Sequence, residues 1–164
     1  MNNLQKWLLR NALLAALYAV LTMALAPISY GPVQVRLSEV LTLLAFYNKR
    51  WVPGLTLGCF LANIGSPFGL TDMAIGTLAT FLAVLPMHKA RSLYKASLLP
   101  VLTNGVLIGA ELYYLAALPP ETGGFGIGAS MMYVAVGEWL SVTIVGRLLF
   151  NAAMQNEEFR KLVQ

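Results

Sequence analysis

The stretch that decides the fold is LLRNALLAALYAVLTMALA, residues 8–26, whose only charged residue is Arg10. An apolar run of about 20 residues is long enough to cross the hydrocarbon core of a bilayer as an α-helix. Its apolar residues do not alternate with polar ones, which disfavours a β-barrel. Lys6, Arg10 and this run also resemble a signal peptide, but Pro27 directly after Ala24-Leu25-Ala26 disfavours cleavage. The run therefore predicts a transmembrane helix.

The composition extends this prediction to the whole chain. Of its 164 residues, 58% are hydrophobic and 11% are charged, whereas soluble domains are about 45–50% apolar and about 25% charged. A soluble fold of this size could not hide so much apolar surface. Inside a bilayer, helices satisfy their own backbone hydrogen bonds. We therefore expect an all-α integral membrane protein, a single multi-pass domain over residues 1–164 in the cell membrane.

Polar and Pro/Gly-rich breaks divide the chain into six predicted transmembrane helices. Residues 51–64 and 38–47 are shorter than the ~20 residues that span a bilayer, so each is tilted, borrows connector residues or ends in a re-entrant loop. A single broken hairpin is the alternative. The GGFGIG stretch, residues 123–128, lacks a preceding strand and a following lysine, which favours an extracellular loop or lid over a phosphate loop. The six ranges are 8–26, 38–47, 51–64, 72–87, 94–118 and 127–154.

The basic residues orient this arrangement. With six helices and a cytoplasmic N-terminus, Arg36 alone lies outside, and ten other basic residues lie inside, as membrane proteins prefer. Both termini are therefore predicted to be cytoplasmic. This distribution accounts for the net charge of +4, so we expect membrane lipid and no nucleic acid as a partner. The ten are Lys6, Arg10, Lys49, Arg50, Lys89, Arg91, Lys95, Arg147, Arg160 and Lys161.

Two glutamates are predicted to lie within the membrane, where an ionisable residue is costly and indicates function. Glu111 shares one face of its helix with Asn104, seven residues or ~10 Å away. Glu138 lies eleven residues into the last helix. The same outer half of the membrane holds further polar residues near helix ends, namely Arg36, Glu39, Asn63 and Asp72.

Simpler explanations exist for several of these side chains. Glu39 and Asp72 could complement a helix dipole, and Asn63 and Asn104 could join helices. Aromatic residues at the same level could form an interfacial belt. Together, however, acids, amides and flat rings suit a planar ligand that is neutral or cationic and donates N–H groups. The aromatic residues are Tyr30, Phe68, Tyr113, Tyr114, Phe125, Tyr133 and Trp139.

The sequence gives no sign of an enzyme. His88 is the sole histidine and lies among basic residues at a helix end, and Cys59 is the sole cysteine, within an apolar run that indicates packing. A nucleophile–base pair and metal-ligand spacing are both missing from the sequence. We therefore expect no catalysis, cofactor or metal.

Small residues recur at four-residue spacing, which lets helices approach closely. The pairs are Ala12/Ala16, Ala15/Ala19, Gly54/Gly58 and Gly105/Gly109. They could pack helices within the chain, and the alanine face of the first helix could equally dock a partner subunit.

Two stretches carry a family resemblance. APISYGPVQVRLSEVLTLLAFYN (residues 26–48) and GLTLGCFLANIGSPFGLTDMAIGTLATFLA (residues 54–83) closely resemble the QueT family. Its members are substrate-binding S components of energy-coupling factor (ECF) transporters, which are ABC transporters, assigned to queuosine precursors. The resemblance implies an S-component-like bundle that receives its ligand from outside and associates with a membrane coupling subunit and two cytoplasmic ATPases. It also implies docking of that subunit on an alanine motif that matches Ala12, Ala15, Ala16 and Ala19.

The implied ligand is a 7-deazaguanine such as 7-aminomethyl-7-deazaguanine (preQ1), or queuine. Glu138 or Glu111 is then expected on the base edge, with Asn63, Asn104 and Asp72 completing the site. Tyr30 and Trp139 are candidates to stack on the base. Arg36 and Glu39, in the RLSE stretch, are expected to pair and order the first loop as a lid.

Two other functions compete with this one. The chain could act alone as an oligomeric channel or secondary transporter, or it could be a membrane scaffold that binds no small ligand.

Overall fold

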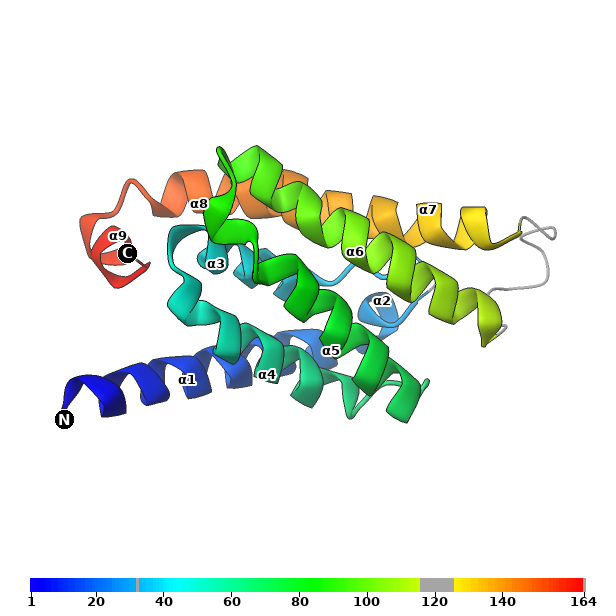
Figure 1. Cartoon of the computed structure of the whole chain (residues 1–164), viewed down its shortest axis with the longest axis horizontal. Coiled ribbons are helices and arrows are strands. Elements are labelled where there is room, and N and C mark those ends of the chain that lie inside the picture. The colour runs from blue at the N-terminus through cyan, green and yellow to red at the C-terminus, as the bar shows by residue number, and fades with distance from the viewer. Residues whose placement is uncertain (32, 116–125, 164) are drawn as a thin grey trace.

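The computed structural model describes residues 1–31, 33–115 and 126–163, and within these ranges the chain is helical without strands (Figure 1). This confirms the all-α architecture for the part described. In chain order the helices are α1 (Asn3–Ala24), α2 (Ala26–Ser29), η1 (Leu37–Leu43), α3 (Leu44–Tyr47), η2 (Lys49–Trp51), α4 (Val52–Asn63), α5 (Leu70–Val84), η3 (Met87–Lys89), α6 (Leu93–Tyr114), α7 (Gly126–Glu138), η5 (Trp139–Gly146), α8 (Arg147–Ala153) and α9 (Glu157–Val163).

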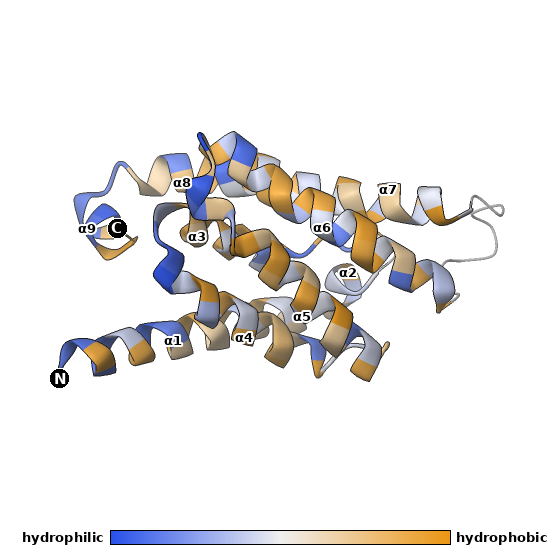
Figure 2. Cartoon of the chain, viewed as in Figure 1, coloured by the Kyte–Doolittle hydropathy of each residue, from blue (hydrophilic) through white to orange (hydrophobic). Residues whose placement is uncertain are grey.

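The helices close into a ring. Contacts run from α1 to α4, from α4 to α5, from α5 to α6 and from α6 to α7, and η1 completes the ring between η5 and α1. Both chain ends lie at the same end of this bundle (Figure 1). Hydrophilic residues also gather toward that end (Figure 2). We call it the basic end, because Lys6, Arg10, Arg50 and Lys161 line one cavity there.

Within the described residues, four helical segments are long and apolar enough to cross a membrane. They are Asn3–Ala24, Leu70–Lys89, Leu93–Tyr114 and Gly126–Ala153. Their outer faces carry exposed leucines, as lipid-facing helices do. At 12 residues, α4 is only about 18 Å long, and Leu37–Tyr47 is shorter still. The number of six spans therefore remains a prediction.

The predicted second helix is mostly a 3₁₀-helix. Its seven-residue run, η1, is longer than the three or four residues that are usual for this conformation. Only Leu37 in η1 is exposed, because the segment lies between η5 and α1. Buried on nearly all sides, η1 has no amphipathic period by which its conformation could be recognised.

The last long helix changes its winding midway. It is α-helical in α7, π-helical in η5 and α-helical again in α8. Beyond it, α9 was not predicted, and it folds back so that Trp51 Nε1 donates to the carbonyl oxygen of Val163 at 3.2 Å. Residues 116–118 of the fifth predicted helix and residues 123–125 of the predicted lid lie outside the described residues.

Both glycine pairs pack helices within the chain. A Cβ added at Gly58 would lie 3.1 Å from Ala15 Cα, and one added at Gly109 would lie 2.4 Å from Met131 Cα. Gly54 and Gly105 are similarly close to α1 and α7. These contacts bring α4 against α1 and α6 against α7, which draws the polar side chains of the ring toward one another.

Candidate functional site

Polar side chains from successive elements of the ring meet in its interior. All have 4% or less of their surface exposed, and direct or electrostatic contacts link them. We call this set the polar cluster. It consists of Arg36, Glu39, Asn63, Asp72, Asn104, Glu111 and Glu138.

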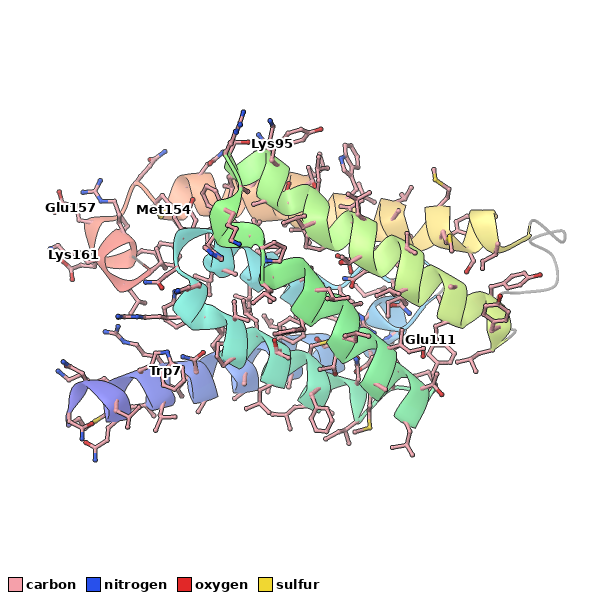
Figure 3. All side chains as sticks on the ribbon, in the orientation of Figure 1. Trp7, Lys95, Glu111, Met154, Glu157 and Lys161 are labelled. Carbon is pink, nitrogen blue, oxygen red and sulfur yellow. The ribbon has the colours of Figure 1, made fainter. Side chains whose placement is uncertain are left out.

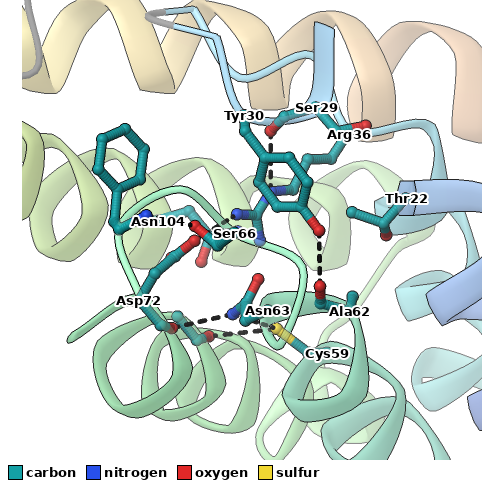
Figure 4. A network of polar contacts seen from close by, with 12 residues as sticks. Thr22, Ser29, Tyr30, Arg36, Cys59, Ala62, Asn63, Ser66, Asp72 and Asn104 are labelled. Carbon is teal, nitrogen blue, oxygen red and sulfur yellow. Dashed lines mark hydrogen bonds and ion pairs between the residues drawn. The ribbon is translucent and has the colours of Figure 1, made fainter. Parts of the chain in front are cut away.

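Arg36 ties the loop before η1 to the rest of the cluster. Its Nε donates to the carbonyl oxygen of Ser29 at 3.1 Å, and its Nη2 lies 3.4 Å from Asp72 Oδ2 (Figure 4). The guanidinium carbon also lies 5.4 Å from the centre of the Tyr30 ring. The predicted pairing of Arg36 with Glu39 is wrong, because the loop directs the arginine toward the start of α5.

Two further hydrogen bonds fasten this corner of the site. Tyr30 donates its hydroxyl to the carbonyl oxygen of Ala62 at 2.6 Å, and Asn63 Nδ2 donates to the carbonyl oxygen of Asp72 at 2.9 Å (Figure 4). The loop, the end of α4 and the start of α5 are thereby joined. Tyr30 lies where the sequence predicted an aromatic ring beside the polar residues.

Glu39 has partners that sequence reasoning missed. One of its oxygens accepts from the Tyr18 hydroxyl of α1 and from Thr80 Oγ1 of α5, the latter at 3.4 Å. Thr80 Oγ1 also lies 3.2 Å from Cys59 Sγ, and Cys59 is fully buried as predicted for a packing residue. The only hint of Tyr18 was a phenol deep within an otherwise apolar helix.

The two intramembrane glutamates differ in their surroundings. Glu138 accepts from Asn104 Nδ2 at 2.8 Å, whereas both carboxylate oxygens of Glu111 are buried without a hydrogen-bond partner among the described residues. Figure 3 shows Glu111 near the end of α6 that lies away from the basic end. Glu138 interacts electrostatically with Glu39, and Glu111 with Asp72. Arg36, the only arginine in the polar cluster, also interacts electrostatically with Glu39, Glu111 and Glu138 besides its ion pair with Asp72.

The cluster leaves hydrogen-bond acceptors unused. A buried polar atom without a partner costs roughly 1–3 kcal/mol and calls for an explanation. Seven carboxylate or amide oxygens are in this state among the described residues, while the only unpaired amide nitrogen there is Gln34 Nε2. The oxygens are Glu39 Oε2, Asn63 Oδ1, Asp72 Oδ1, Asn104 Oδ1, Glu111 Oε1, Glu111 Oε2 and Glu138 Oε2.

Gln34 is a second residue that the sequence did not single out. Its φ of 47° lies in the left-handed region, and its side chain is 2% exposed. Non-glycine residues in this region are uncommon and cluster at functional sites. The loop around Gln34 presses on α7, because a Cβ added at Gly137 would lie 1.8 Å from the carbonyl oxygen of Val33.

Three predicted aromatic residues lie outside the cluster. Trp139 is 41% exposed on the outer surface of the bundle, so it does not stack on anything bound inside. Tyr113 and Tyr114 are also exposed, as an interfacial belt requires. Phe125 lies outside the described residues.

The alanines of α1 divide into two pairs. Ala15 and Ala19 are buried at 1% and 8% exposure, and Ala15 meets Gly58 of α4. Ala12 and Ala16 are exposed. The inner pair therefore serves packing, and only the outer pair is free for a partner.

The arrangement suits a ligand that donates hydrogen bonds and carries positive charge, because unused acceptors and acids prevail. Three or more metal-binding side chains do not come together anywhere in residues 1–31, 33–115 or 126–163.

The sequence matches the QueT transporter family model over residues 8–155, which is most of the chain. The chain belongs to the QueT transporter family. This match contains the whole polar cluster and ends before α9. A "Queuosine precursor transporter QueT" of Lactococcus lactis subsp. cremoris (strain MG1363) is 46% identical over 71 residues, which cover 42% of this chain and 41% of that protein. No solved structure matches the chain.

Proposed function

We propose that this QueT family member is the substrate-binding S component of an ECF transporter and binds a 7-deazaguanine queuosine precursor in the polar cluster. The observation that carries the proposal is the set of seven unpaired acceptor oxygens in a buried site. A ligand rich in N–H donors would pair them and remove their desolvation cost.

The chemistry of the ligand complements these atoms. A 7-deazaguanine donates from its ring N1–H, its 2-amino group and its five-membered-ring N–H, and its O6 accepts. An aminomethyl group adds a cation with three donors. Gln34, whose backbone lies beside Gly137 of α7, carries an amide Nε2 that is unpaired among the described residues, and we propose it as the donor for O6. The name of the Lactococcus lactis relative, which specifies a queuosine precursor, supports the same class of ligand.

We assign roles from the partners that each acid already has. Glu138 is held by Asn104 and suits the base edge, where position decides recognition. Glu111 has two free oxygens and suits the flexible ammonium group. Arg36, Asn63 and Asp72 then form the floor of the site, since they bond mainly to one another. Glu39 belongs to the supporting shell through Tyr18 and Thr80.

The proposed topology has six crossings and both termini in the cytoplasm. The basic end then faces inward by the positive-inside rule, and the polar cluster lies toward the outer side. Ala12 and Ala16 of α1 form the docking face for a membrane coupling subunit, which works with two cytoplasmic ATPases. Ala15 and Ala19 drop out of that face because α4 covers them.

Calorimetric titration of the purified protein tests the ligand class. We expect the aminomethyl deazaguanine to bind more tightly than the 7-cyano compound or guanine, because only its side group is cationic. Queuine, whose side group is also an amine, is compared in the same series. Equal binding of all four compounds, or binding of none, would contradict the proposal.

A transport assay separates this function from that of a self-sufficient transporter. Liposomes that contain only this protein should bind the aminomethyl compound without accumulating it. Uptake should require the coupling subunit, the ATPases and ATP. Uptake by the chain alone would favour a channel or secondary transporter instead.

A further inference from the structure

Two adjoining cavities open at the basic end of the bundle, away from the polar cluster. One has a volume of about 280 Å³ and polar walls from α1, η2 and α9. The other has a volume of about 490 Å³ and is lined by leucines and aromatic rings. Arg10, Trp51 and Leu162 line both, so the two cavities are neighbours that share a wall.

The polar cavity is cationic. Lys6, Arg10, Arg50 and Lys161 line it, and the described residues that line it include no acidic side chain. The ion pairs within the described ranges are Arg36–Asp72 and Lys161–Glu158. Three of the four basic side chains therefore have no acidic partner among those residues. An anion placed there would meet positive charge from three segments of the chain.

Hydrogen bonds hold the walls of this cavity in place. Trp7 Nε1 donates to the carbonyl oxygen of Arg50 at 3.2 Å, which ties α1 to η2. Trp51 Nε1 ties η2 to the end of α9 through Val163. Gly54 N donates to Asn11 Oδ1 at 2.8 Å just beneath. These hydrogen bonds join the three segments that carry the basic residues. Figure 3 shows Trp7 on α1 and Lys161 on α9 at this end of the bundle.

The apolar cavity leads from this cationic cavity along the bundle. Leu13 and Leu17 of α1 form one wall, and Leu149 and Leu162 form the other; all four are substantially exposed. Its floor is the core of the protein, with Leu44 and Phe150. The groove therefore places apolar surface where hydrocarbon chains would lie, directly beside a site for an anion.

From this juxtaposition we infer a binding site for an anionic phospholipid. Its phosphate lies in the cationic cavity between Arg10 and Arg50, and one acyl chain lies in the groove between α1 and α8. Charge favours an anionic headgroup over a zwitterionic one, because all the charged side chains among the described lining residues are cationic. Two juxtamembrane basic residues together strengthen the binding of anionic lipid by about tenfold or more. Tryptophans are common at the level of the headgroups.

Native mass spectrometry of the purified full-length chain tests the site. Phosphatidylglycerol and phosphatidylcholine with identical acyl chains are offered in equal amounts, and the fraction of protein that carries each is measured. We expect preferential retention of phosphatidylglycerol, which falls about tenfold or more in the double variant R10Q/R50Q. The single variant K6Q, at an exposed side chain, should show a smaller loss in the same direction. Equal retention of both lipids by the wild type would overturn the proposal.

The matched control is the double variant K89Q/R91Q, which removes two basic charges outside the cavity. It should keep the lipid preference of the wild type, and both double variants should keep their affinity for the deazaguanine. Equal lipid loss in the control would mean that general charge, rather than this cavity, holds the lipid. Displacement of the lipid by inorganic phosphate alone would show a simple anion site. Unchanged lipid retention in R10Q/R50Q with lost binding to the coupling subunit would assign the cavity to a protein partner.

Discussion

Two sets of buried polar residues in this protein differ in how completely they are hydrogen-bonded within the chain. Between α1 and its neighbours, Asn11 Nδ2 donates to Trp7 and its Oδ1 accepts from Gly54, while Thr22 and Ser38 pair at 2.6 Å. In the polar cluster, Glu111 has no hydrogen-bond partner within the described part of the chain, and Glu138 uses one oxygen of two there. The polar side chains of the first set form their hydrogen bonds within the chain and so stabilise the fold.

Under the proposed function, the difference separates polar groups that stabilise the fold from polar groups that bind the ligand. A polar side chain that stabilises a helix bundle finds its partners within the chain. A polar side chain that pairs only with a ligand loses its hydration on folding without gaining a partner, which lowers the stability of the ligand-free protein. Burial alone does not distinguish the two sets, since Thr22 and Glu138 are 0% and 1% exposed.

The substitution Gly137→Ala should have the largest effect on ligand binding by the polar cluster. Its Cβ would collide with the carbonyl oxygen of Val33, so the loop that carries Gln34 and Arg36 must move. Affinity for the deazaguanine should fall more than about 100-fold, because several contacts are lost together. Titration calorimetry measures this loss. Gly128→Ala on the same helix, where a Cβ meets nothing within 4 Å, should bind as the wild type does.

Neutralising the acids should come next in size. Glu138→Gln and Glu111→Gln each remove a charged acceptor from the ligand and should weaken binding at least about tenfold, or ~1.4 kcal/mol. The ligand-free protein should be no less stable in thermal unfolding, since the change relieves repulsion among buried acids. Wild-type titration curves for both variants would exclude these glutamates from the site.

Asn11→Ala should show the opposite pattern. It leaves the buried N–H of Gly54 without an acceptor, which should lower the free energy of unfolding by about 1–3 kcal/mol. Thermal unfolding in detergent measures this change, and the protein that remains folded should bind deazaguanine with unchanged affinity. A loss of affinity at full stability would mean that Asn11 belongs with the binding groups.

The smallest effect on the isolated chain is expected from Ala16→Leu. Ala16 is exposed, so unfolding and ligand binding should not change, while co-purification with the coupling subunit should be lost. Ala15→Leu, one residue away on the buried face, should instead destabilise the chain by about 1–3 kcal/mol through overpacking. Normal assembly of the Ala16→Leu variant would remove the outer alanines from the docking face.

Sequence reasoning named all seven residues of the polar cluster, because charged and amide side chains are rare in apolar helices. Glu111, Glu138 and Asn104 stand out in the printed sequence for that reason, and all three are buried inside the ring. Gln34 and Tyr18 could not be found in this way. The role of Gln34 depends on a left-handed backbone, and that of Tyr18 on a contact across 21 residues.

The helix boundaries show the same division between local and long-range causes. Helix α1 begins at Asn3, earlier than predicted, because Asn2 and Gln5 form a capping box. This signal is local but polar, so the apolar pattern did not reveal it. Conversely, the exposure of Trp139 and the docking of α9 depend on how distant segments meet. The 3₁₀ winding of η1 likewise reflects its place between η5 and α1.

The π-helical turn that follows Glu138 sets the angular phase of the last long helix. Each residue of an α-helix advances by about 100°, so one residue more or fewer within Trp139–Gly146 would rotate α7 by that angle relative to α8. Glu138 would then swing from the interior toward lipid, while Phe150 kept its place in the core. If Glu138 binds the ligand as we propose, the length of this segment helps to set ligand specificity, and relatives that differ by a single insertion there should present another side chain to the ligand.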